Sequence, residues 1–191
     1  MPETHAHHHH EMPTSGWPLT SVAVSATLHC LTGCAIGEIA GMAIGMAFGL
    51  ANGATVALSI ALAFLFGYSL TSLPLLRAGL AVAAVVPIAL ASDTFSIATM
   101  ELIDNAVVLA IPGAMDAGLG ALLFWGSLSF ALAVAFVAAV PVNRWLIGRG
   151  KGHAAVHRTG IHGGPSPHVV GATLAVAFVF GTAVLVGEAI A

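Results

Sequence analysis

The stretch HCLTGCAIGEIAGMAIGMAFG, residues 29–49, decides the fold, because it is a long apolar segment with a glycine at every fourth position. Residues four apart lie on the same face of a helix. Small residues let two helices approach closely in lipid, where no hydrophobic force drives them together. The row therefore predicts a membrane helix whose glycine face packs against another helix. Its members are Gly33, Gly37, Gly41, Gly45 and Gly49.

The rest of the chain is equally apolar. Of its 191 residues, 58% are hydrophobic and only 7% are charged, whereas a soluble domain has about 25% charged residues. A span needs about 20 apolar residues. The sequence therefore predicts an all-α fold, a polytopic helical bundle in the membrane with about five transmembrane helices. The expected spans are residues 19–50, 54–76, 79–112, 117–141 and 168–190.

The few basic residues predict the topology. Arg77 follows the second span, and the other four basic residues, Arg144, Arg149, Lys151 and Arg158, follow the fourth. Both loops lie on the same side of the membrane, and positive charge favours the cytoplasmic side. We therefore expect a cytoplasmic N-terminus, with residues 1–18 as a disordered His-rich tail and residues 142–167 as a basic, His-containing cytoplasmic loop.

A second row runs beside the glycines on the first span. It consists of Cys30, Cys34, Glu38, Met42 and Met46. Cysteine and methionine are soft metal ligands, and a carboxylate inside the bilayer needs a partner or a wet cavity. Because His29 lies on the same side, we interpret this face as part of a metal site. The alternative is ordinary packing of small and flexible apolar residues.

The third span has an acidic face formed by Asp93, Glu101 and Asp104. No Lys or Arg lies inside any span to pair with these groups, so they must be protonated, hydrated or bound to a cation. The simplest geometry places this face against the first span, where thiols and carboxylates converge. The alternative is a polar face that joins helices by hydrogen bonds. The predicted metal ligands are His29, Cys30, Cys34, Glu38, Asp93, Met100, Glu101 and Asp104.

Histidines outside the spans form two further groups. The tail contains His5 and the run His7–His10, which is typical either of metal capture or of a purification tag. The basic loop contains a second group, predicted as a secondary metal site: His153, His157 and His162. The alternative for these three is a hydrated loop whose Lys and Arg only set the topology.

Three strings resemble a bacterial membrane family catalogued as domain of unknown function 4396: LHCLTGCAIGE (28–38), DTFSIATMELIDNAV (93–107) and PVNRWLIGRGKGHAAVH (141–157). The likeness covers about residues 20–190. It implies a multi-pass protein of the bacterial cytoplasmic (inner) membrane, and for some members an association with copper-handling domains. The candidate residues at motif positions of these strings are His29, Cys30, Cys34, Asp93, Met100, Glu101, Asp104, Asn105, His153 and His157.

The leading functional hypothesis is a membrane protein that binds or transports a soft metal, copper first and zinc second. One alternative is a thiol redox protein that uses Cys30 and Cys34, and another is a proton-coupled carrier of a small solute. Haem fits less well, since His29 is the one candidate axial ligand inside the membrane. The lipid bilayer and a metal ion are the expected partners, with homo-oligomers an open option and nucleic acid excluded. No residue is assigned a catalytic role.

Overall fold

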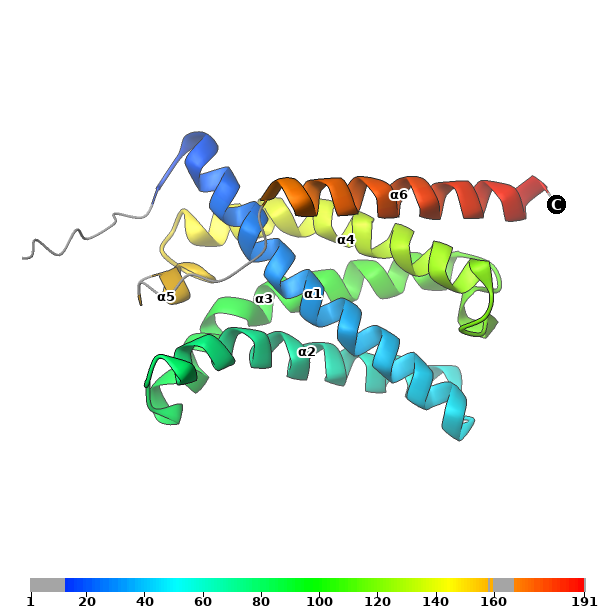
Figure 1. Ribbon diagram of the computed structural model, residues 1–191, viewed down its shortest axis with the longest axis horizontal. Helices are drawn as coiled ribbons and strands as arrows, with labels where there is room; N and C mark the ends of the chain where they lie inside the picture. The colour runs from blue at the N-terminus through cyan, green and yellow to red at the C-terminus, as the bar shows by residue number, and fades with distance from the viewer. Residues whose placement is uncertain (1–12, 158, 160–166, 191) are drawn as a thin grey trace, which may run out of the picture.

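Five long helices, each apolar enough to cross a membrane, make up most of the chain (Figure 1). The computed structural model describes residues 13–157, 159 and 167–190. The five are α1 (Gly16–Phe48), α2 (Asn52–Arg77), α3 (Val82–Ala110), α4 (Leu122–Ile147) and α6 (Pro167–Ile190). Two short helices, η1 (Ala114–Asp116) and α5 (Ala154–His157), lie in the connections. The prediction of an all-α bundle with about five spans is confirmed.

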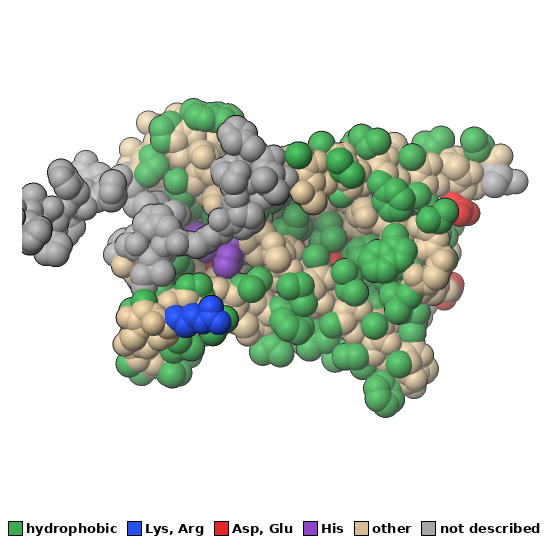
Figure 2. Space-filling model, in the orientation of Figure 1, with side chains coloured by type: hydrophobic (Ala, Val, Ile, Leu, Met, Phe, Trp, Pro, Cys, Tyr) green, Lys and Arg blue, Asp and Glu red, His purple; other side chains and the backbone are tan. Residues whose placement is uncertain are grey.

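Successive long helices run back and forth across the bundle (Figure 1). Helix α1 packs on α2 and α4, α3 packs on α2 and α4, and α6 lies along α4. The ends of α2 and α4 lie at the same end of the bundle as α5, and Arg77 and Arg144 are in the last turns of their helices. Figure 2 shows Lys or Arg side chains at this end and Asp or Glu side chains at the other. We refer to the first as the basic end.

Two of the boundaries that differ from the predictions involve proline. Helix α1 begins at Gly16, inside the expected tail, because Pro18 lies in its first turn, where a backbone N–H has no helical partner to lose. Helix α4 continues through Pro141 to Ile147, six residues into the expected loop 142–167. A proline removes one helical hydrogen bond, and the residues beyond it are held by other contacts.

The glycine row of α1 packs against α2. A Cβ atom on Gly33 would meet the backbone of Gly67 at 2.5 Å, and one on Gly37 would collide with the backbone of Ala63. Gly41 and Gly45 make equally close approaches to α2 at Ser59 and Thr55. The last glycine of the predicted row behaves differently: Gly49 is the C-cap of α1, with φ 62°, and has no neighbour where its Cβ would lie. Its role is to end the helix and not to pack.

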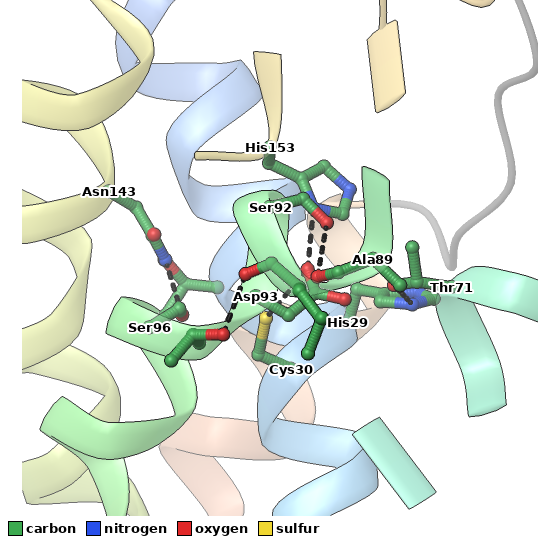
Figure 3. Close-up of polar contacts among 12 residues, drawn as sticks. His29, Cys30, Thr71, Ala89, Ser92, Asp93, Ser96, Asn143 and His153 are labelled. Atoms are coloured by element: carbon green, nitrogen blue, oxygen red, sulfur yellow. Dashed lines mark hydrogen bonds and ion pairs between the residues drawn. The ribbon is translucent and has the colours of Figure 1, made fainter. Parts of the chain in front are cut away.

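Asn143 ties α4 to the two helices that contain the candidate site. Its side-chain amide donates to Ser96 Oγ on α3 (Figure 3) and to Thr27 Oγ1 on α1, both at 2.8 Å. The side chain is 1% exposed. This pair of interhelical bonds explains why α4 continues past Pro141.

We expect Asn143→Ala to lower the free energy of unfolding by about 1–3 kcal/mol, because interhelical hydrogen bonds contribute about 0.6–1.7 kcal/mol each in membrane proteins. Denaturant titration in detergent measures the change. The matched control is Asn52→Ala, since Asn52 is exposed and donates to Asp116 at 3.3 Å. It should change stability by less than about 0.5 kcal/mol. Equal losses for both variants would contradict the assigned role of Asn143.

Candidate functional site

The polar faces of α1 and α3 meet in the interior of the bundle, and the predicted ligands divide into two groups. The Asp93 cluster consists of His29, Cys30, Asp93 and His153. The Glu38 cluster consists of Cys34, Glu38, Glu101 and Asp104. Eight residues separate Asp93 from Glu101, which is about 12 Å along a helix. The sequence predicted one converging site, and the structure places two at different depths.

Asp93 is the centre of the first cluster, and its side chain is fully buried. Its Oδ1 lies 3.2 Å from Nδ1 of His153 and accepts a hydrogen bond from the Cys30 thiol at 3.8 Å (Figure 3). The second oxygen, Oδ2, has no hydrogen-bond partner among the described residues. The carboxylate therefore faces the Cys30 thiol on α1 and the His153 imidazole in the segment that follows α4.

His29 completes the Asp93 cluster from the α2 side. Its Nε2 lies 3.0 Å from the hydroxyl oxygen of Thr71 on α2, and its ring centroid is 5.6 Å from that of His153. A cavity of about 20 Å³ lies beside both rings and is also lined by Thr71, Pro74 and Val156. Such a volume holds about one water molecule. The cluster thus adjoins a small cavity toward the basic end of the bundle.

His153 reaches Asp93 because the chain turns sharply after α4. Gly150 and Gly152 have φ values of 68° and 60°, which glycine adopts without steric cost. A Cβ atom on Gly152 would lie 3.6 Å from the backbone oxygen of Ser92, so the turn passes close to α3. The sequence assigned His153 to a secondary loop site, and this tight turn moves it into the main cluster.

The Glu38 cluster lies deeper along the same interface. The Glu38 carboxyl group faces those of Asp104 and Glu101, and the Cys34 thiol lies beside Glu101. Asn105 donates to Glu101 Oε2 at 3.4 Å. Several carboxylate oxygens have no partner among the described residues: both oxygens of Glu38, Oε1 of Glu101 and Oδ1 of Asp104. This cluster is acidic and incompletely satisfied.

The remaining predicted residues lie elsewhere. Met100 is fully buried and packs in the apolar core with Cys30, Cys34 and Ile97. The tail histidines, His162 and the side chain of His157 lie outside the described part of the chain. Thr71 and Ser59 on α2 were not predicted, although every buried residue of α2 belongs to one four-residue row that ends at Leu75. That periodicity was the available indication that α2 faces the site.

As the side chains stand, the described residues contain no group of three or more His, Cys, Asp or Glu arranged to hold a metal ion. Both cysteines are free thiols and are 1% exposed. Residues 20–152 match the model of a family described as Domain of unknown function (DUF4396). No curated protein and no solved structure gives a significant match.

Proposed function

This chain belongs to the family described as domain of unknown function 4396, and we propose that it binds a soft or borderline transition-metal ion inside the membrane, copper first and zinc second. The proposed ligands are the four members of the Asp93 cluster. The observation that supports the proposal is a fully buried carboxylate that lies between a thiol and an imidazole, with a second imidazole next to them.

The spacing around Asp93 suits a metal ion. Bond lengths of about 2.0–2.3 Å in a tetrahedral zinc site put N and O ligands about 3.4 Å apart and S and O ligands about 3.6 Å apart. The separations here are 3.2 Å from Asp93 Oδ1 to His153 Nδ1 and 3.8 Å to Cys30 Sγ. His29 would have to turn from Thr71 to become the fourth ligand.

The donor types select the class of metal. A thiolate and two imidazoles favour copper and zinc, whereas Mg²⁺ and Ca²⁺ prefer oxygen ligands. The cavity beside His29 and His153 lies toward the basic end of the bundle, and we propose it as the side from which the ion approaches. A protein that carries the ion across the membrane and a protein that only stores it would both use this cluster.

The thiol redox alternative has less support. A redox pair needs two sulfur atoms that reach each other and a partner, and a disulfide requires a distance of about 3.5–4.5 Å between Cβ atoms. The thiol of Cys30 instead donates to Asp93, and that of Cys34 lies beside Glu101 in the other cluster. Both thiols are buried, so a partner has no direct access to them.

The two cysteines provide a matched test of the metal proposal. In full-length protein with Asn at the tail histidines, His5 and His7–His10, bound metal is measured by mass spectrometry after loading with Cu(I) or Zn(II). We expect about one ion per chain, lost in Cys30→Ser and kept in Cys34→Ser, because only Cys30 belongs to the Asp93 cluster. Loss in both variants would place the ion between the clusters, and retention in both would overturn the proposal.

A further inference from the structure

A second small cavity lies beside the Glu38 cluster, on the side away from the basic end. Its volume is about 10 Å³, close to the size of one water molecule. Glu38 and Asp104 line it from α1 and α3, and Thr55 and Ser59 line it from α2. Met115, in η1, also lines it, so the cavity extends toward the connection between α3 and α4.

The polar groups around this cavity lack partners. Glu38 is 2% exposed, and its carboxyl group faces that of Asp104; neither of its oxygens accepts a hydrogen bond from a donor group among the described residues. Ser59, 3% exposed, belongs to a different helix, and its Oγ is also without a partner among the described residues. Buried polar atoms are nearly always satisfied. Glu38 on α1 and Ser59 on α2 therefore line a space that fits about one water molecule, and neither receives a hydrogen bond from a donor group among the described residues.

The surrounding charges restrict what that ligand is. The basic residues within α2 and α4, Arg77 and Arg144, lie in last turns at the basic end, so neither neutralises Glu38. Two neighbouring carboxylates in a low-dielectric site cannot both be ionised and instead share a proton. A hydrated metal ion needs space for several waters, which this cavity does not offer. A proton delivered through one water molecule fits both the charge and the volume.

We propose that Glu38 and Asp104 form a proton-binding site that exchanges with water at the end of the bundle opposite the basic end. In the loading step, a hydronium ion in the cavity transfers its proton to a carboxylate oxygen of the pair and leaves a neutral water molecule. The other titratable groups that face the pair are Glu101 on α3 and Cys34 on α1, while α2 contributes only hydroxyl groups.

This site does not depend on the proposed metal cluster. The two cavities share no lining residue, and none of the proposed metal ligands lines the cavity beside Glu38. A protein in which both sites operate would have a metal-binding cluster near one end and a proton-binding pair toward the other. That arrangement is expected of a proton-coupled carrier.

Infrared difference spectroscopy tests the proton site, because a protonated carboxyl group has its own C=O stretching band. We expect a pH-dependent carboxyl band in the full-length protein that is lost in both Glu38→Gln and Asp104→Asn. The control is Asp116→Asn, which alters a carboxylate that accepts a hydrogen bond from exposed Asn52 and should keep the band. Metal content is measured in the same samples and should be unchanged, which separates failure here from failure of the metal proposal.

Three outcomes would overturn the proton site. The first is the absence of any titrating carboxyl band in the unaltered protein, which needs no variant and so does not depend on folding of a mutant. The second is a band that persists in both substitutions. The third is loss of the band on adding Na⁺ or K⁺ at constant pH, which would identify the ligand as a metal cation.

Discussion

Asp93→Asn is expected to lower the affinity for Cu(I) or Zn(II) by about 100-fold or more. The carboxylate lies 3.2 Å from His153 Nδ1 and 3.8 Å from the Cys30 thiol, so it contacts two of the other three proposed ligands. Even residues that only orient metal ligands contribute about 10–100-fold to affinity, and loss of a charged ligand should exceed that. Competition with a chromophoric chelator measures the change.

The control for this substitution is Asp116→Asn. Asp116 lies in η1, beyond the C-terminal end of α3, and its carboxylate accepts a hydrogen bond from exposed Asn52. The control variant should leave the affinity within about twofold. The metal-free Asp93→Asn protein should fold, because the amide has nearly the same shape as the carboxyl group and its oxygen can still accept the hydrogen bond from the Cys30 thiol. An unchanged metal affinity in a folded Asp93→Asn protein would remove Asp93 from the site.

The largest expected effect on stability is that of Gly37→Val. A side chain at Gly37 collides with the backbone of Ala63 on α2, and backbone cannot move aside as a flexible side chain does. Helices α1 and α2 would have to separate along their most extensive contact. Overpacking of a tight interface typically costs about 1–3 kcal/mol, and we expect a loss near 3 kcal/mol or more in the free energy of unfolding.

Gly187→Val is the matched control, because Gly187 is an exposed glycine inside α6 with nothing within 4 Å of the position that a Cβ atom would take. Valine has a better helix propensity than glycine, so this variant should be neutral or slightly more stable. The two are compared by thermal unfolding in the same detergent. Similar stability for both variants would show that the close approach of α1 to α2 does not hold the bundle together.

The sequence predicted the fold well because the length and polarity of each span are local properties. An apolar run of about 20 residues has few alternatives to a membrane helix. Helix ends were harder to place. The continuation of α4 beyond Pro141 depends on hydrogen bonds from Asn143 to Thr27 and Ser96, which join residues far apart in the chain.

The candidate site was predicted in part. Four-residue spacing correctly put Cys30 and Asp93 on the faces that meet, because periodicity fixes the direction of a side chain from its helix. The eight-residue spacing of Asp93 and Glu101 already separates two heights along α3. Periodicity does not fix the relative height of two helices, so which thiol faces which carboxylate was not predictable. His153 was misplaced because its position depends on two left-handed glycines, Gly150 and Gly152, and not on any helical pattern.

X-ray absorption spectroscopy of the metal-loaded protein tests the central claim most directly, because it reports the atoms bound to the ion. We predict one sulfur neighbour at about 2.3 Å together with nitrogen or oxygen neighbours at about 2.0–2.2 Å. The sulfur contribution should disappear in Cys30→Ser and persist in Cys34→Ser. A first shell of nitrogen and oxygen alone in the unaltered protein would contradict a metal site at the Asp93 cluster.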